Sequence, residues 1–425
     1  MKKYESYKDS GVGWIGKIPS HWSCVPFRRI AKVQCNLVRP SENLTMFQIS
    51  PDSIEKNSGK IIKTRTVEEA KVDSDNHRFY KGQILYSKIR PLLNKVTIAP
   101  YDGLCSADMY PISTIENTEY VMYYMLSEAF LSSVKNIVAD RVKMPKINQD
   151  ELKNTDFVIP PFSEQQVIVD YLKDKTLKIE QYVSARERER ELFDSLKQSE
   201  IANVVTKGLN PNVRMKDSGI FWVPQIPSHW KTTKLKHILV KLYRKKTADA
   251  ELLVCSNKGK VIKKGDAKMG LVADNNDIYQ GVCKGDLLIH GMDTWHGAIA
   301  ISDYDGMCTP VVHVCDSSQN KKFVVYYLQF MALSKVFKLI SNGVRQNTSD
   351  FRSWDKVGAI PIMLPPLEEQ QAIVDYIEAK LSKIDSCMAN LQAEIDYLKE
   401  FKQRLISDVV TGQICVAKPQ RGEQQ

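Results

Sequence analysis

The chain has 425 residues, of which 26% are charged and 43% hydrophobic, and its formal net charge is +10. No apolar run approaches the ~20 residues of a membrane-spanning helix, and the charged N-terminus lacks the apolar segment of a signal peptide. We therefore expect a cytoplasmic protein without membrane contact. Nine cysteines without a C-x-x-C pair, and seven histidines without H-E-x-x-H, give no pattern for a metal site. The length favours more than one domain.

The first motif along the chain, GVGWIG at 11–16, matches the G-x-G-x-x-G pattern of dinucleotide-binding turns. Such a turn follows a buried strand, but the residues before Gly11 are charged and polar. The surrounding KDSGVGWIGKIPSHW (8–22) recurs as KDSGIFWVPQIPSHW (216–230), identical at ten of fifteen positions, with phenylalanine and proline replacing Gly13 and Gly16. Because a phosphate-binding turn needs those glycines, we interpret the repeated stretch as a structural aromatic clip that holds the start of each half.

A second repeated stretch shows that the whole chain is duplicated. PPFSEQQVIVDY (160–171) and PPLEEQQAIVDY (365–376) are identical at nine of twelve positions. Shorter matches lie between the two repeats in the same order, but the interiors of the halves scarcely agree. We therefore expect two halves with a common frame that recognise different things.

The order of these markers predicts four segments in an α+β protein: a first globule, a helical spacer, a second globule and a second spacer. We place them at 1–157, 158–210, 211–363 and 364–425. Strand-like runs occur at 83–89, 95–100, 286–292, 298–302 and 311–315, and helices are expected near 118–137 and 321–340.

The segment IPPF (159–162) is similar to the Asn/Asp-Pro-Pro-aromatic loop of amino-methylating DNA methyltransferases. The first side chain of that loop must accept a hydrogen bond, which Ile159 and its counterpart Leu364 cannot do. Two prolines more simply end a strand before a helix, with Ser163 or Glu164 in the first helical turn.

Each double proline is followed by a heptad pattern that predicts a long helix. Since such helices need a partner, we expect them to form an antiparallel coiled coil that relates the two halves by internal pseudo-twofold symmetry. A parallel pair and two separate dimerisation helices are the alternatives. The first helix is polar in its middle, which suggests a loose contact there or a contact with another chain. The expected contact residues are Ile168, Leu172, Ile179, Val183 and Phe193 on the first helix, and Ile373, Ile377, Ile384, Leu391, Ile395 and Leu398 on the second.

The positive charge is concentrated in the globules. Residues 1–156 carry a net charge of +5 and residues 211–363 carry +9, whereas the helical segments 157–210 and 364–425 carry −1 and −3. This distribution fits globules that contact DNA phosphates through Lys and Arg.

Four polar, loop-like stretches are the candidate DNA-binding segments, two in each globule. Arg, Asn and Gln can pair with base edges, whereas Lys and Thr more often contact phosphates. The candidates in the first globule are Ser87, Lys88, Arg90, Asn94, Lys95, Arg141, Lys143, Lys146 and Asn148, and in the second His290, Thr294, Trp295, His296, Arg345, Gln346, Asn347 and Thr348.

Together, the doubled KDSG-x-x-W and IPSHW, the stretches GQIL and GDLL, SKIRPLLNK, and the doubled PP-x-x-EQQ-x-IVDY resemble the specificity (S) subunits of type I DNA restriction–modification enzymes. The resemblance covers the whole chain. It implies that each globule is a target recognition domain for one half of a split site in double-stranded DNA, and that the helices set the distance between the halves.

The resemblance also implies partners and cofactors. Two modification subunits would bind S-adenosylmethionine and methylate adenine, and two restriction subunits would use ATP and Mg²⁺ for translocation and cleavage. This chain would have no catalytic centre and bind no cofactor or metal. The alternatives are a stand-alone DNA adenine methyltransferase and a coiled-coil scaffold that does not bind DNA.

Overall fold

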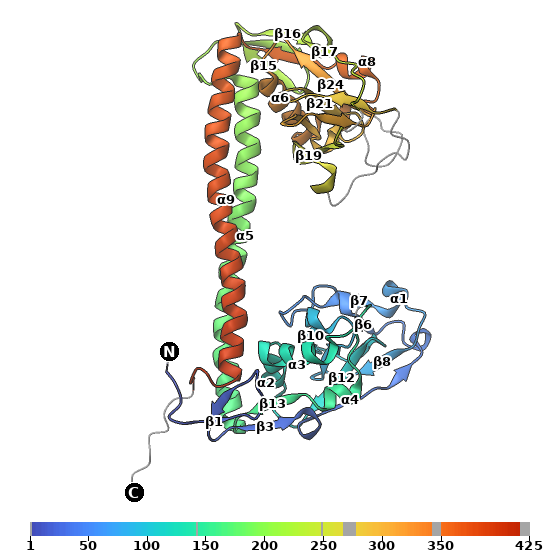
Figure 1. Cartoon of the computed structure of the whole chain (residues 1–425), viewed down its shortest axis with the longest axis vertical. Helices are drawn as coiled ribbons and strands as arrows, with labels where there is room; N and C mark the ends of the chain where they lie inside the picture. The colour runs from blue at the N-terminus through green and yellow to red at the C-terminus, as the bar shows by residue number, and fades with distance from the viewer. Residues whose placement is uncertain (1, 142, 248–249, 267–277, 342–349, 417–425) are drawn as a thin grey trace. The chain divides into compact units, whose positions relative to one another are not determined.

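The computed structural model describes residues 2–141, 143–247, 250–266, 278–341 and 350–416. The chain divides into two compact units, of residues 1–187 with 392–425 and of residues 188–391. Each unit contains one globule and a part of both long helices, α5 (Phe162–Lys207) and α9 (Leu367–Val410) (Figure 1). The four segments expected from the sequence are each continuous along the chain, whereas each of these units combines both helices with a globule. The boundaries of the four segments stay predictions. In the described part of the chain, no helix is both long and apolar enough to cross a bilayer.

The first globule contains two larger sheets and two strand pairs. One sheet has the order β10 (Val96–Ile98), β9 (Ile84–Ser87), β12 (Met109–Thr114), β4 (Ala31–Val33), and the other the order β5 (Leu37–Val38), β8 (Asn76–Phe79), β11 (Gly103–Ser106), β6 (Phe47–Ile49), β7 (Arg65–Thr66). The pairs are β1 (Tyr7–Asp9) with β2 (Lys17–Pro19), and β3 (Ser23–Pro26) with β13 (Asp156–Ile159). The short helices are α1 (Val67–Ala70), α2 (Thr118–Met125), α3 (Glu128–Val138) and α4 (Gln149–Lys153).

The second globule repeats the four-stranded sheet as β22 (Ile299–Ile301), β21 (Leu287–His290), β24 (Val312–Ser317), β17 (Leu239–Lys241). The strand pairs are β14 (Met215–Ile220) with β15 (Val223–Pro227), β16 (Lys231–Lys234) with β25 (Pro361–Leu364), β18 (Leu253–Ser256) with β19 (Lys260–Lys263), and β20 (Gln280–Val282) with β23 (Gly306–Cys308). The helices are α6 (Lys321–Leu333), α7 (Val336–Ile340) and α8 (Trp354–Gly358).

The two globules agree in the four-stranded sheet and in two strand pairs, β1–β2 with β3–β13 in the first and β14–β15 with β16–β25 in the second, and they differ in the remaining strands. The first has a five-stranded sheet where the described strands of the second form two separate pairs. The strands and helices expected from the sequence are present, except that the helices near 118–137 and 321–340 are each broken in two. The duplicated frame is therefore the four-stranded sheet with its helices and these two strand pairs, and the remaining strands have diverged.

The GVGWIG segment is the loop of the β1–β2 hairpin, and a strand rather than a helix follows it. This contradicts the strand–turn–helix context of a nucleotide-binding turn. Gly11 and its counterpart Gly219 have φ of +78° and +71°, and the N–H of each donates to the aspartate two residues earlier at 2.8 Å. Glycine recurs here because the turn needs positive φ.

The aromatic clip binds the first turn of each long helix. Trp22 is fully buried, and its indole N–H donates to Glu164 Oε2 of α5 at 3.0 Å, while His21 Nε2 lies 2.9 Å from the same oxygen. In the second unit His229 Nε2 lies 2.7 Å from Glu369 Oε2 of α9. A carboxylate is favoured at a helix N-terminus because of the helix dipole, so this glutamate stabilises both the clip and the helix.

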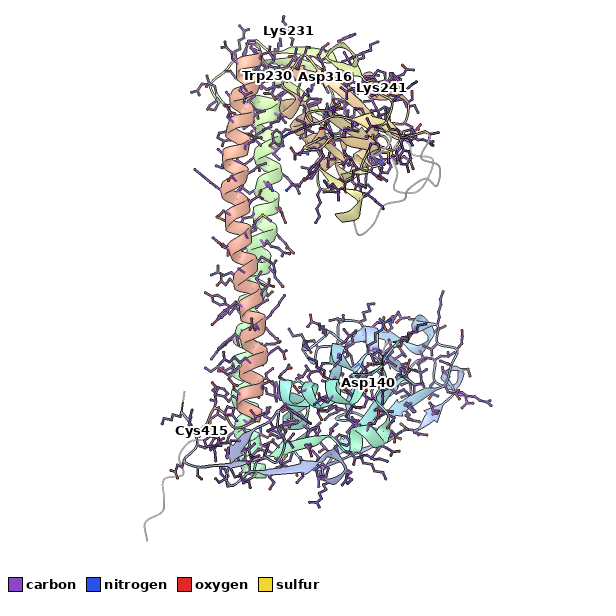
Figure 2. The ribbon with its side chains drawn as sticks, in the orientation of Figure 1. Asp140, Trp230, Lys231, Lys241, Asp316 and Cys415 are labelled. Atoms are coloured by element: carbon purple, nitrogen blue, oxygen red, sulfur yellow. The ribbon has the colours of Figure 1, made fainter. Side chains whose placement is uncertain are left out.

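The far end of the other long helix also packs on each clip. Gly412, which follows α9, has φ +76°, and an added Cβ would lie 2.3 Å from Pro19 Cδ and 3.2 Å from the Trp22 ring. At Gly208, which follows α5, an added Cβ would lie 2.9 Å from Glu369 Oε1 and 3.2 Å from the Trp230 ring. Figure 2 shows Trp230 and Cys415 beside the helix ends in their respective units. Each clip therefore joins a globule to both helices.

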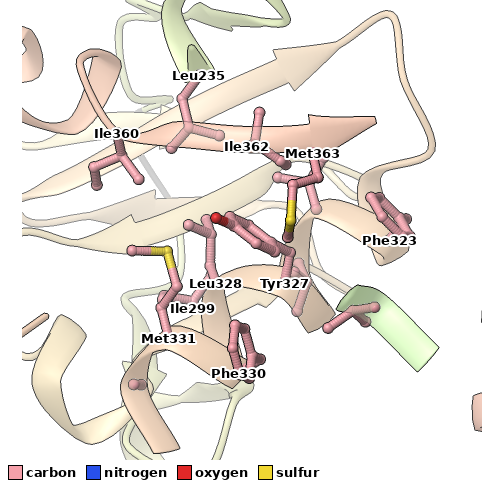
Figure 3. Packing of buried hydrophobic residues seen from close by; sticks show 14 of the residues in the cluster. Leu235, Ile299, Phe323, Tyr327, Leu328, Phe330, Met331, Ile360, Ile362 and Met363 are labelled. Atoms are coloured by element: carbon pink, nitrogen blue, oxygen red, sulfur yellow. The ribbon is translucent and has the colours of Figure 1, made fainter. Parts of the chain in front are cut away.

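A buried tyrosine attaches helix α2 of the first globule and helix α6 of the second to a neighbouring strand. Tyr327 of α6 lies fully buried among apolar side chains of β25 and α6, and its hydroxyl donates to Pro361 O at 2.8 Å (Figure 3). Tyr124 takes the same place in the first unit and donates to Asp156 O at 3.1 Å. These hydroxyls satisfy strand carbonyl groups that would otherwise be buried without a donor.

The long helices run antiparallel within each unit. In the first unit Ile168 and Leu172 share an apolar core with Leu405 and Val409, near the other end of the second helix. In the second unit Ile373 and Ile377 share a core with Val204 of α5. All the expected contact residues are buried or half-buried: Ile168, Leu172, Ile179, Val183, Phe193, Ile373, Ile377, Ile384, Leu391, Ile395 and Leu398.

The polar middle of α5 is paired with α9 rather than left loose. In the first unit Arg186 Nε lies 3.2 Å from Glu394 Oε2 and Glu187 Oε1 lies 2.8 Å from Lys399 Nζ. In the second unit, Lys197 Nζ lies 2.6 Å from Asp385 Oδ1. Ion pairs thus replace apolar contacts where the heptad pattern fades, so the expectation of a loose contact is wrong for these residues.

Candidate nucleic-acid interface

Backbone pairing brings the two candidate loops of the first globule together, although residues 96–140 lie between them in the sequence. Ile89 and Lys146 form an isolated β-bridge. The Arg90 N–H donates to Pro145 O at 2.8 Å, and the Ile147 N–H donates to Lys88 O at 3.0 Å. The stretches 87–95 and 141–148 therefore form one surface.

The basic side chains of this surface differ in how firmly they are held. Arg90 has φ +44° and is exposed, as is Lys143. Lys88 Nζ lies over the Tyr110 ring, 5.4 Å from its centroid, and Lys146 Nζ lies 3.6 Å from Asp108 Oδ1. The least constrained of these cations are thus Arg90 and Lys143.

Arg141 is engaged with an acidic neighbour. It pairs with Glu151 of α4, and its hydrogen bond holds the pKa of that carboxyl below the usual range. Asn148 caps the same helix, since its Oδ1 accepts from the Glu151 N–H at 2.8 Å. These two residues lie at the surface, but they primarily fix the end of the loop.

Three candidates of the first loop face the protein interior or its edge. Ser87 is 2% exposed and donates to Ile89 O at 3.0 Å, and Asn94 is fully buried with φ +44°. Lys95 is half-buried and donates to Pro51 O at 2.5 Å. Ser87 and Asn94 shape the loop from inside, and their contact with DNA stays a prediction that this burial disfavours.

The second globule joins its candidate loops in the same way. The Phe351 N–H donates to Gly291 O at 3.0 Å, which places the end of the 343–351 stretch beside the 290–297 loop. The predicted DNA contacts of Arg345, Gln346, Asn347 and Thr348 lie outside the described residues. The two globules therefore use corresponding backbone pairs to hold loops of different sequence.

The 290–297 loop is a folded turn whose side chains are largely engaged. Burial lowers the pKa of His290 despite the nearby Asp293, and its Nδ1 accepts from the Asp293 N–H at 3.1 Å. Thr294 is 1% exposed, and its contact with DNA stays a prediction that this burial disfavours. Trp295 packs against the core beneath Lys338, and His296 lines a cavity beside the long helices.

Sequence reasoning missed a basic segment of the second globule, KLYRKK at 241–246. Tyr243 is 80% exposed, and Lys241 Nζ lies 4.9 Å from the centroid of its ring. Arg244 pairs with Asp286. Burial lowers the pKa of His313, and the Lys241 charge lowers it further, while His313 Nε2 lies 2.7 Å from Phe351 O. The sequence pattern that could have indicated this segment is the presence of four basic residues around one tyrosine.

Within the described ranges, no group of three or more His, Cys, Asp or Glu side chains could hold a metal ion. The two units share three features. Each globule has two loops joined by backbone hydrogen bonds, basic side chains beside these loops, and an aromatic clip that attaches it to the helix pair. A duplicated protein with this arrangement belongs to the class of two-part nucleic-acid recognition proteins.

Comparison with known proteins identifies the family. The family model for the type I restriction modification DNA specificity domain matches residues 43–184 and 227–397, so the chain belongs to this family. It is a DNA specificity subunit, and the catalytic centres of type I systems lie in other subunits.

Individual relatives agree with this assignment. The chain is 41% identical over 155 residues to the EcoDI specificity subunit of Escherichia coli, a match that spans 36% of this chain and only 35% of that protein. It is 24% identical over 442 residues to the putative MjaX specificity subunit of Methanocaldococcus jannaschii, covering 97% and 98% of the two chains. A chain from a solved type I restriction–modification system has the same fold, with a TM-score of 0.71 at 15% identity over 93% of this chain and 99% of that one.

Proposed function

We propose that each globule recognises one half of a two-part DNA target through its joined loops. The observation that carries this proposal is that one backbone hydrogen bond joins the loops in each globule, from the Ile147 N–H to Lys88 O and from the Phe351 N–H to Gly291 O. The frame that joins the loops is repeated while the side chains on the loops are not. Two unlike half-sites are what such a protein would recognise.

The long helices would set the distance between the half-sites. Each is clipped to a globule at its first turn, and the two are joined by ion pairs and apolar contacts within each unit. DNA with correct halves at the wrong separation would then satisfy only one globule at a time.

The methyltransferase and nuclease activities would reside in partner subunits. We infer two modification subunits that use S-adenosylmethionine and two restriction subunits that use ATP and Mg²⁺, assembled in the cytoplasm on double-stranded DNA. Exposed apolar side chains on the long helices, Leu177, Leu192 and Tyr397, support a role of these helices in binding other subunits. Family membership disfavours both the stand-alone methyltransferase and the scaffold that does not bind DNA.

Replacement of Arg90 by alanine tests the assignment of the first globule. If the exposed guanidinium pairs with a base, its loss should cost about 1–3 kcal/mol of discrimination at that position, and only in one half-site. The measurement is the methylation pattern of a genome in cells that carry the variant and its partners. Arg29→Ala, at another exposed position of the same globule, is the control. Equal relaxation in both half-sites would contradict the assignment.

A further inference from the structure

Both halves carry the same four-residue turn beside the long helices. The sequence is N-x-G-K at Asn57–Lys60 and again at Asn257–Lys260. The third residue has positive φ in each, +78° at Gly59 and +68° at Gly259. The turns belong to the parts of the globules that have otherwise diverged, so their common sequence needs a reason of its own.

In the first unit the turn is fastened to both helices. Lys60 Nζ lies 2.7 Å from Glu180 Oε2 of α5, whose other oxygen lies 3.0 Å from Lys402 Nζ of α9. The Gln403 side chain donates to Asn57 O at 2.6 Å. Burial alone would raise the pKa of Glu180, but the hydrogen bonds and charges of the two lysines outweigh it and lower that pKa. The carboxylate is thus held ionised between a globule and two helices.

The same turn also supports a candidate DNA-binding loop. The Asn57 N–H donates to Asn94 O, at the end of the 87–95 loop, at 3.3 Å. Gly59 O accepts from the buried Thr97 hydroxyl at 2.7 Å. A continuous set of hydrogen bonds and ion pairs therefore runs from the helix pair, through the turn, to the base of the loop.

The second unit contains counterparts of the residues that join the turn to the helices in the first. With the offset of 205 residues that relates the PP motifs, Glu180 corresponds to Asp385, Lys402 to Lys197 and Gln403 to Gln198. Lys197 Nζ lies 2.6 Å from Asp385 Oδ1, so the helix–helix part of the arrangement is formed. We call Lys60, Glu180 and Lys402 the first triad, and Lys260, Asp385 and Lys197 the second triad.

The globule part of the second triad is open. Among the described residues, no hydrogen bond or ion pair joins the 257–260 turn to α5 or α9. A cavity of about 620 Å³ lies between them instead, lined by Lys258, Lys260, Gln198 and Asp385. The corresponding cavity in the first unit, at Lys60 and Glu180, is about 390 Å³. An aspartate is one methylene shorter than a glutamate, which accounts for part of the missing reach.

We propose that the two triads are positioning elements that set how each recognition globule is held against the helix pair. The first is closed without DNA, whereas the second closes when Lys260 reaches Asp385, so the second globule can adjust its approach to its half-site. Lys60, Glu180, Lys260 and Asp385 act through the loops and do not contact DNA. The expected effect of the triads on DNA recognition rests on the proposed function. The attachment of the 57–60 and 257–260 turns to the helices does not.

Hydrogen exchange of the full chain without DNA tests the fastening. Glu180→Gln should speed amide exchange in 57–62 by roughly two- to fivefold, the range for a partly exposed ion pair. Reversal of all three charges, K60E with E180K and K402E, should restore protection. Asp385→Glu should slow exchange in 257–261, because its longer side chain reaches Lys260. The matched control is Lys173→Gln, which removes the 2.6 Å pair with Glu119 that also joins globule to helix without touching the turn.

The assembled complex on DNA supplies the second readout. With a target identified from the methylation pattern, Glu180→Gln should reduce discrimination against a separation changed by one base pair, while Lys173→Gln should not. If Glu180→Gln and Asp385→Glu change exchange no more than the control does, the triads do not fasten the turns. If exchange changes but discrimination does not, the positioning role is wrong while half-site recognition, tested separately at Arg90, stands.

Discussion

Replacing Trp22 by alanine is expected to lower the free energy of unfolding of the first unit by about 3–5 kcal/mol, the usual cost of removing a large buried aromatic side chain. The ring is fully buried, its N–H donates to Glu164, and the end of α9 packs on it at Gly412. One substitution therefore loosens the globule from both long helices.

Local stability, measured by native-state hydrogen exchange in α2 and at the start of α5, provides the readout for this variant. Trp14→Ala is the matched control, because that indole is 45% exposed in the same clip and should cost well under half as much. Replacement of the buried tryptophan by phenylalanine should have different effects in the two copies of the clip. Trp22→Phe removes a hydrogen bond to a carboxylate, worth about 1.5–3 kcal/mol, whereas the buried Trp230 Nε1 has no hydrogen-bond partner among the described residues. Equal costs for Trp22→Ala and Trp14→Ala would contradict the clip.

Introducing a carboxylate at Ile395 should open the helix pair in the first unit. Ile395 is 1% exposed, and an unpaired charge buried there is expected to cost about 3–5 kcal/mol. Ile395→Asp should lower helical circular dichroism and abolish binding to the two-part DNA target by the assembled complex.

Tyr397→Asp provides the control for this prediction. It places the same charge two residues away on the same helix, at a side chain that is 66% exposed, and should change helicity and unfolding little. If the two variants lower helicity and the free energy of unfolding equally, the antiparallel contact between α5 and α9 does not hold the chain together.

The duplicated frame could be predicted because its signals are periodic or repeated. Heptad positions such as Leu172 and Ile377 follow from the 3.6-residue period of a buried helix face, and both are buried as expected. The role of Glu164 was also accessible, because an acceptor is favoured in the first turn of a helix. Its partners, Trp22 and His21, are more than 140 residues away, and no local pattern reveals such a pairing.

The candidate site was harder to predict, because the side chains of a loop turn in or out with its backbone. Ser87, Asn94 and Thr294 have the right chemistry for DNA contact but are buried. Asn94 adopts positive φ, which the sequence does not reveal for a non-glycine residue.

Contacts between distant charged residues likewise required the three-dimensional register. The pair Glu119–Lys173 of the first unit reappears in the second as Lys322–Glu378, with the charges exchanged. In each half, the globule and the helix thus carry opposite charges at this contact. Neither sequence segment alone shows why it carries the positive or the negative charge. The same holds for Arg186 and Lys197, whose acidic partners lie about two hundred residues along the chain.

Binding of the assembled complex to a series of DNAs, with constant half-sites whose separation varies by single base pairs, tests the central claim most directly. If the helix pair fixes the distance between two recognition globules, affinity should have one sharp optimum. It should fall roughly tenfold or more one base pair away, because the DNA must then be bent or untwisted to reach both globules. Equal affinity across the series would show that the helices do not set the spacing, and would contradict the account.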